Sequence, residues 1–126
     1  MIGIDIIKIT RMEQLIERFG DKALKRFLSS DEIELIKSSK SAAGFWAAKE
    51  ACSKALGTGI GSECSFFDIK IYKNARGAVF IALSKRIVEK YKIRQSALSI
   101  THDGDYAIAV VTLQMESSTP NKVEQF

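Results

Sequence analysis

The residues best suited to chemistry are two carboxylates and a lysine, Asp5, Glu50 and Lys54. Asp5 interrupts an otherwise apolar run over residues 2–9, where a carboxylate is costly to bury unless it is paired or holds a metal ion. Glu50 and Lys54 lie one turn apart on a predicted helix, so together they can grip a metal-bound phosphate. Mg²⁺ needs only one or two protein carboxylates, because water and phosphate oxygens complete its shell. The three residues therefore fit a Mg²⁺ site that acts on a phosphate compound.

The same three residues also have simpler interpretations. Strand alternation would point Asp5 away from Ile4 and Ile6, towards solvent at a strand edge. Glu50 and Lys54 would form an ordinary ion pair on a solvated helix face, worth about 0.3–0.5 kcal/mol. Residue types and spacing alone leave both interpretations open.

Two further segments are candidate ligand contacts. The turn over residues 57–61 holds three glycines, which would let a ligand approach the backbone closely. It lacks the Lys-Ser/Thr pair of a P-loop, and it could simply end the preceding helix. His102 lies where a predicted strand meets a turn, either as a phosphate contact or as a plain turn residue.

Composition excludes several classes of protein. The chain has one His and two cysteines, Cys52 and Cys64, which are too few and too far apart for a Cys/His zinc site. A nucleophilic triad could be built only on His102. No apolar run reaches the roughly 20 residues of a membrane span, and the first residues do not form a signal peptide. We therefore expect a cytoplasmic protein that binds no membrane. The net charge of +4 favours an anionic partner.

Hydrophobic periodicity and capping patterns predict one α+β domain with a mainly antiparallel sheet packed against helices. Thr10 with Glu13, and Ser29 with Glu32, form capping-box patterns that would each open a helix. The strongest helix covers residues 42–56. Strands are expected over residues 2–9, 65–73, 78–83, 96–101 and 105–113, with short helices over 21–28 and from Ser84 to Tyr91. The domain would span residues 1–113, followed by a mobile polar tail over 114–126.

The region 8–26 carries six bases against three acids. It is either a solvated helix face or a docking surface for an acidic protein. The bases are Lys8, Arg11, Arg18, Lys22, Lys25 and Arg26. A non-catalytic module that binds an acidic protein or a nucleic acid through these helices is the alternative to an enzyme. Residues 76–81 faintly resemble an RNA-recognition strand, but Ala78 and Leu83 stand where stacking aromatics are needed.

Three segments together resemble the holo-acyl-carrier-protein synthase family of phosphopantetheinyl transferases, over about residues 1–113. They are Gly3–Ile6, then Trp46–Ala55 with the following Gly57–Gly61, then Ser99–His102 followed by Tyr106–Ala109. Their order and separation match the short bacterial type. Phe45 departs from the pattern, since many relatives carry a basic residue there.

The resemblance implies transfer of 4′-phosphopantetheine from coenzyme A to a serine of apo-acyl carrier protein, in support of fatty acid biosynthesis. By analogy, Asp5 and Glu50 are the Mg²⁺ ligands and, with Lys54, the catalytic residues. The implied coenzyme A contacts are Lys49, Lys54, Gly57, Thr58, Gly59, Thr101 and His102. The implied docking residues for the acidic carrier protein are Arg11, Lys22, Lys25 and Arg26. The family further implies a homotrimer with sites between subunits, and no nucleic acid.

Overall fold

The computed structural model describes residues 1–116 and residue 125. In chain order the elements are β1 (Ile2–Lys8), α1 (Ile9–Phe19), α2 (Asp21–Lys25), α3 (Ser30–Glu34), α4 (Ser39–Leu56), the 3₁₀ turn η1 (Phe66–Asp68), β2 (Ile69–Lys73), β3 (Val79–Leu83), α5 (Lys85–Tyr91), β4 (Ile93–Asp103) and β5 (Tyr106–Met115). The strand pairs are all antiparallel, which confirms the predicted α+β class.

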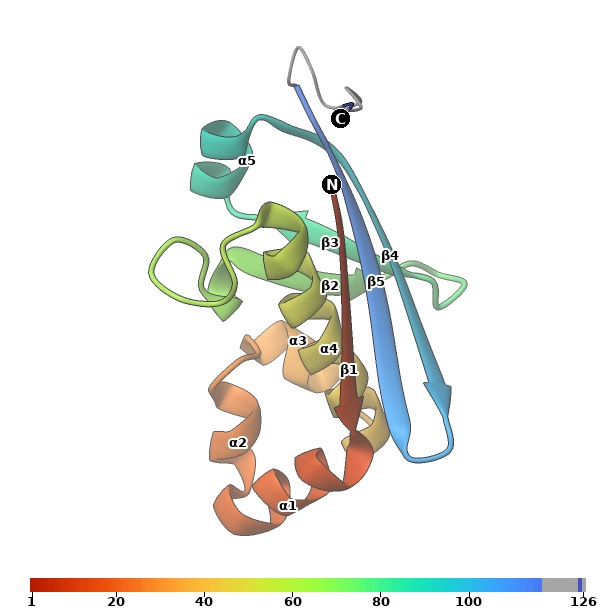
Figure 1. Ribbon diagram of the computed structural model, residues 1–126. Coiled ribbons are helices and arrows are strands. Elements are labelled where there is room, and N and C mark those ends of the chain that lie inside the picture. The colour runs from red at the N-terminus through yellow and green to blue at the C-terminus, as the bar shows by residue number, and fades with distance from the viewer. Residues whose placement is uncertain (117–124, 126) are drawn as a thin grey trace.

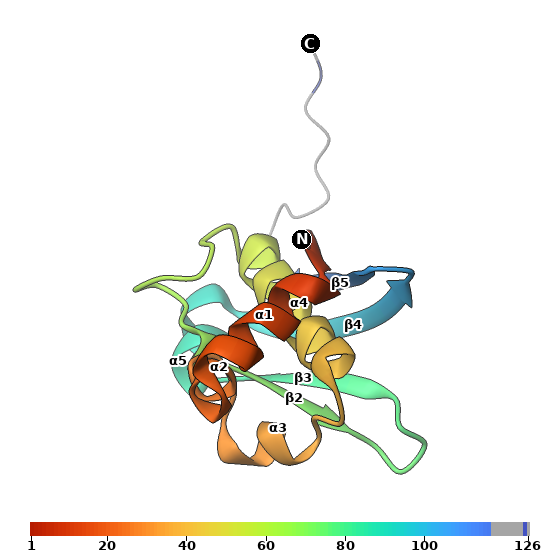
Figure 2. The same ribbon diagram turned by 90° about the horizontal axis from the view of Figure 1, so that it is seen from below.

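The strands form two sheets on either side of the long helix α4 (Figures 1 and 2). The larger has the order β1-β5-β4, so that β1 and β4 are its two edges, and the smaller is the β2-β3 hairpin. α1 crosses over α4, as the view in Figure 2 shows. The two edges of the larger sheet are where the predicted site residues are found.

Gly3 lets β1 lie directly on α4. A Cβ atom at this position would stand 1.9 Å from the carbonyl oxygen of Ala51 and 2.6 Å from the amide nitrogen of Ala55. Both are backbone atoms, which cannot move aside as a flexible side chain can. The missing side chain therefore brings the next inward-facing residue of β1, Asp5, close to the C-terminal half of α4.

The two faces of the larger sheet differ sharply in exposure. The face against α4 is buried and carries small or apolar side chains, among them Ala107, Ala109 and Val111. On the opposite face Ile2, Ile4 and Ile6 are 68%, 59% and 57% exposed. No helix of the described residues covers this face, which is turned towards the viewer in Figure 1.

α4 is defined at both ends by its own sequence. The Ser38 side chain accepts a hydrogen bond from the amide of Ser41, which forms a capping box. Gly57 ends the helix in the left-handed region with φ of 82°, a conformation that glycine adopts without strain. Between the ends, small residues such as Ala47, Ala48 and Ala51 are fully buried, so α4 is the central element of the core.

Several predicted boundaries are corrected by the structure. Thr10 and Glu13 do not cap a helix, because α1 begins at Ile9 and its N-cap Lys8 makes no side-chain capping bond. The capping box of Ser29 with Glu32 is confirmed. β5 continues to Met115, two residues past the predicted end of this strand, because β4 continues to pair with it there. The remainder of the predicted tail lies outside the described residues, apart from Glu116 and Gln125.

Within residues 1–116 the longest helices are interrupted by charged or polar positions, and none has the length and apolar character needed to cross a lipid bilayer.

Candidate functional site

Asp5, Lys54 and Glu50 meet where β1 runs along the C-terminal half of α4. The Lys54 ammonium donates to Asp5 Oδ1 at 2.9 Å and to the Ile4 carbonyl at 3.2 Å. The Asp5 side chain is 15% exposed and that of Lys54 is 52% exposed, so the pair opens to solvent on one side. Asp5 thus faces α4 rather than bulk water, and Lys54 pairs with Asp5 instead of with Glu50. We call these three residues the carboxylate cluster.

The charges of the carboxylate cluster act on one another. Partial burial raises the pKa of Glu50, and the nearby carboxylate of Asp5 raises it further. Lys54 and Arg11 oppose this shift. Arg11, predicted as a docking residue, therefore lies on α1 within electrostatic range of Glu50. The sequence did not indicate that Arg11 lies near Glu50, because their proximity depends on how α1 crosses α4.

The residues of the carboxylate cluster fit a Mg²⁺ ion. Two like charges side by side favour a cation between them, and Mg²⁺ commonly takes two carboxylates together with water and phosphate oxygens. Among the residues that the structure describes, no group of three or more His, Cys, Asp or Glu side chains could hold a metal ion. An ion at Asp5 and Glu50 would thus keep open positions for a substrate.

The loop after α4 begins one turn beyond Lys54. The Ser53 carbonyl accepts hydrogen bonds from the amides of Thr58 and Gly59, at 3.1 and 3.2 Å. Gly59 has φ of 66°, and open space surrounds the position of a Cβ atom on both Gly57 and Gly59. The three predicted contacts, Gly57, Thr58 and Gly59, therefore present an accessible backbone next to the carboxylate cluster.

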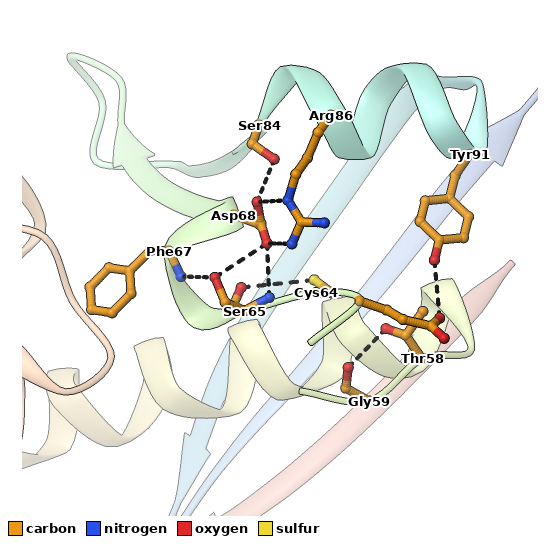
Figure 3. A network of polar contacts seen from close by, with 10 residues as sticks. Thr58, Gly59, Cys64, Ser65, Phe67, Asp68, Ser84, Arg86 and Tyr91 are labelled. Atoms are coloured by element: carbon orange, nitrogen blue, oxygen red, sulfur yellow. Dashed lines mark hydrogen bonds and ion pairs between the residues drawn. The ribbon is translucent and has the colours of Figure 1, made fainter. Parts of the chain in front are cut away.

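A polar network anchors the far end of this loop (Figure 3). Asp68 accepts hydrogen bonds from Ser84 Oγ at 2.7 Å, from the Ser65 amide at 2.8 Å and from Arg86, which grips both carboxylate oxygens. Burial alone would raise the pKa of Asp68, but the bonds from Arg86, Ser84 and Ser65 outweigh it and hold the pKa well below its usual range. The network fixes the loop against α5 and makes no contact with the carboxylate cluster.

His102 lies at the opposite edge of the sheet, in a groove of about 430 Å³. Its Nε2 lies 3.1 Å from the Lys40 carbonyl, which can only accept, so this nitrogen carries the proton. Gly44 leaves room for the imidazole ring, since a Cβ there would stand 3.2 Å from Nε2. Lys73 also lines the groove, a cation that sequence reasoning missed, and so does the unusual Phe45.

Thr101 and His102 point to opposite faces of the sheet. His102 pairs with the buried Ala107 and faces α4, whereas Thr101 pairs with Ile108 and faces outward with Ile6. The two predicted coenzyme A contacts therefore do not form one subsite within a single chain. The prediction ended the strand at residue 101, and so did not apply strand alternation to His102.

The predicted contact of Lys49 with coenzyme A is corrected by its burial. The Lys49 side chain is 0% exposed, and its ammonium is enclosed by Glu32 and two backbone carbonyls. Helical spacing places Lys49 on the inner side of α4, while Glu50 beside it is partly exposed. A fully enclosed ammonium group cannot reach a ligand.

The remaining docking candidates lie on the surface of α2 and just after it. Lys22, Lys25 and Arg26 are all exposed. Phe19, at the end of α1, is 41% exposed and stacks against the Arg18 guanidinium at 5.1 Å. These residues form an exposed, basic and partly apolar surface.

Comparison with known proteins agrees with this fold. The family model of the 4′-phosphopantetheinyl transferase superfamily matches residues 1–111. The chain therefore belongs to the 4′-phosphopantetheinyl transferase superfamily. It is an enzyme of the phosphopantetheinyl transferase class, and relatives highly similar to it are named holo-acyl-carrier-protein synthases.

Two relatives and two solved structures show how close the similarity is. The chain is 64% identical to holo-acyl-carrier-protein synthase of Sulfurimonas denitrificans, over 98% of this chain and 100% of the relative. Identity to the holo-acyl-carrier-protein synthase of Nautilia profundicola is 60%, over 90% of this chain and 98% of the relative. The Helicobacter pylori synthase, solved in complex with coenzyme A, has a TM-score of 0.88 at 52% identity and covers 90% of this chain and 100% of its own. The Bacillus anthracis synthase has a TM-score of 0.77 at 36% identity, covering 91% and 96%.

Membership of an enzyme family overturns the alternative of a non-catalytic binding module. The basic surface of α1 and α2 therefore belongs to an enzyme and not to a non-catalytic binding module.

Proposed function

We propose that this chain transfers 4′-phosphopantetheine from coenzyme A to a serine of apo-acyl carrier protein, with Mg²⁺, in support of fatty acid biosynthesis. The serine hydroxyl attacks the phosphorus atom next to the pantetheine arm, and the bond from that phosphorus to the bridging diphosphate oxygen breaks. The serine loses its proton, and adenosine 3′,5′-bisphosphate leaves with the bridging oxygen.

The observation that supports the reaction most is the carboxylate cluster in a chain of this family. Lys54 lies at the open side of the cluster, where its charge can stabilise negative charge on the reacting phosphate. Asp5 holds the Lys54 ammonium in place. In this proposal Glu50 takes up the serine proton, either directly or through a water bound to the metal.

Asp5 and Glu50 would hold the Mg²⁺ ion, which when bound neutralises charge on the diphosphate. The protein itself then orients the substrate, because phosphoryl transfer depends mainly on positioning and electrostatics. The loop at Gly57, Thr58 and Gly59 lies next to this position, and the open space at its two glycines leaves room for the phosphate groups.

Two copies of the chain would complete the coenzyme A site. The carboxylate cluster lies at the β1 edge and the groove with His102 lies at the β4 edge. The C-terminal half of α4 contributes to the cluster and its N-terminal half lines the groove. A long ligand that uses both halves is accommodated when the β1 edge of one copy adjoins the β4 edge of the next. The exposed isoleucines of β1 give such an assembly an apolar surface to bury, which supports the homotrimer that the resemblance implies.

The carrier protein would dock on the basic surface of α1 and α2. Lys22, Lys25 and Arg26 are exposed there and carry charge opposite to that of an acidic partner. A cytoplasmic location belongs to the same proposal, and Cys52 and Cys64, both unbridged, suit a reducing compartment.

The test is to incubate the protein with coenzyme A, Mg²⁺ and an apo carrier protein, and then to weigh the carrier. Transfer adds about 340 Da, the mass of the phosphopantetheine group by its formula, to the carrier. We expect this gain with the wild type, and none with Glu50→Gln or in excess chelator. An unmodified carrier across several apo carrier proteins contradicts the proposal.

A further inference from the structure

Lys49 is a fully buried lysine whose three donors are all used. Its ammonium donates to the Phe27 carbonyl at 2.7 Å, to Glu32 Oε1 at 2.9 Å and to the Phe66 carbonyl at 3.0 Å. The acceptors come from three separate parts of the chain: the turn after α2, the helix α3 and the 3₁₀ turn η1. Burial lowers the pKa of Lys49, and the hydrogen bond and charge of Glu32 oppose that shift.

Glu32 is equally well satisfied. Its side chain is 2% exposed, and Oε1 accepts from the Ser29 amide at 2.9 Å and from the Ser29 hydroxyl at 3.1 Å. Oε2 accepts from the Ile71 amide at 3.0 Å. The buried pair therefore joins α4, α3 and β2 through directional bonds. A buried ion pair often stabilises a fold no more than apolar residues of the same size. A contribution to stability therefore does not by itself explain why Lys49 and Glu32 form a buried pair.

An aromatic cluster lies beside the ion pair and uses the same neighbours. Trp46 precedes Lys49 by three residues, so the two share one side of α4. Its ring lies 5.1 Å from that of Phe27 and 5.0 Å from that of Phe66. Phe27 and Phe66 thus hold Trp46 through their rings and Lys49 through their carbonyls. We call Trp46, Lys49, Glu32, Phe27 and Phe66 the α4 clamp.

We propose that the α4 clamp fixes the rotation of α4 about its axis, and thereby positions the Glu50 carboxylate opposite Asp5. Glu50 directly follows Lys49, and a side-chain end on a helix lies about 5–6 Å from the axis. A rotation of about 20° therefore displaces the Glu50 carboxylate by about 2 Å, roughly the length of a Mg²⁺–oxygen bond. Lys49 is thus a positioning residue for the reaction, and this inference rests on the proposed function.

The test compares Lys49→Met and Glu32→Gln, which each keep much of the shape and remove one charge. The matched control is Lys85→Met, which breaks an exposed pair with Glu89 on α5. We expect kcat to fall at least about tenfold in both clamp variants while KM for coenzyme A stays within about twofold, as for residues that orient a metal ligand. We further expect Mn²⁺, titrated calorimetrically into the protein alone, to bind at least about fivefold more weakly. The control should match the wild type.

Trp46 provides a readout that is independent of activity. It is the single tryptophan of the chain, so emission on excitation at the red edge of the protein spectrum comes from it alone. A loosened clamp should shift this emission to longer wavelength in both variants, because water gains access to the indole. The control should leave the emission unchanged.

Other outcomes would overturn the proposal. Folded clamp variants with wild-type Mn²⁺ affinity and kcat would show that the clamp only stabilises the fold. A raised KM for coenzyme A in Lys49→Met alone, with Glu32→Gln normal, would make Lys49 a direct contact. If both variants fail to fold, Ser29→Ala removes only one bond to Glu32, and wild-type Mn²⁺ binding there would count against the clamp. An inactive wild type contradicts the proposed function instead, and the clamp is then decided by the Mn²⁺ affinity of the variants together with the Trp46 emission.

Discussion

Lys54 spans from α4 to β1, where it bonds both the Asp5 carboxylate and the Ile4 carbonyl. Replacing it with alanine leaves two neighbouring carboxylates without their shared cation. We expect Lys54→Ala to lower kcat about 100-fold, since one well-placed stabilising group is commonly worth that much. Steady-state kinetics with coenzyme A and a carrier protein measures the effect.

Lys85→Ala on α5 is the matched control for this prediction, because Lys85 is 87% exposed and distant from the carboxylate cluster. The two variants should have similar melting temperatures, since Lys54 is itself half exposed. An unchanged kcat in Lys54→Ala would remove Lys54 from the chemistry.

Single residues also show how far the sequence could predict the site. Asp5, Glu50 and Lys54 could be selected because a carboxylate in an apolar strand is unusual and helical spacing is regular. The burial of Lys49 could not be predicted from the sequence, because its hydrogen-bond acceptors lie 17 and 22 residues away along the chain. Strand alternation could have predicted that Thr101 and His102 point to opposite faces of the sheet. That prediction requires knowing that β4 continues to Asp103.

Among the elements, the contact between β1 and α4 depends on Gly3. In Gly3→Ala the new methyl group would overlap backbone atoms of Ala51 and Ala55, so β1 has to move away from the helix. We expect a loss of about 2–4 kcal/mol in the free energy of unfolding, near the upper range for overpacking. Chemical denaturation followed by circular dichroism measures it.

Gly61→Ala is the control for the β1–α4 contact. Gly61 has open space around its Cβ position and no positive φ, so this change should stay within about 0.5 kcal/mol. Equal stability of the two variants would show that β1 and α4 can separate without cost.

The loop between α4 and β2 depends on Asp68, whose pKa is held low by Arg86, Ser84 and Ser65 against the effect of burial. A folded-state pKa below the unfolded value near 3.9 means that Asp68 stabilises the fold above about pH 5. That stabilisation is lost as the pH falls through the folded-state pKa. We expect Asp68→Asn to cost about 1–3 kcal/mol at pH 7, because Arg86 and Ser84 lose a charged acceptor.

The difference in stability between wild type and Asp68→Asn should shrink steadily from about pH 5 towards pH 2. Glu89→Gln, on the neighbouring helix α5 and 66% exposed, should show no such dependence. Denaturation curves across this pH range measure both variants, and a constant difference for Asp68→Asn would contradict the low pKa.

For the whole molecule, the main constraint is that the residues of the proposed coenzyme A site lie at two edges of one sheet. The fold class followed from periodicity and capping patterns, because these are local. The way α4 packs against the sheet could not be predicted from local patterns, since it depends on close contacts at Gly3 of β1 and at Gly44 of α4, beside β4. One chain therefore offers two separated halves, and the uncovered isoleucine face provides a surface on which copies can meet.

Mixing two defective variants tests the sharing of sites between copies. Glu50→Gln damages the carboxylate cluster, and His102→Ala damages the groove. In a ring with one half-site from each of two neighbours, random assembly at equal amounts gives about a quarter of sites with both halves intact. Coexpressed variants should therefore recover about a quarter of wild-type transfer, beyond the residual activity of either alone. If both halves of the site come from one chain, every chain in the mixture is defective, and no activity above that residual level is recovered.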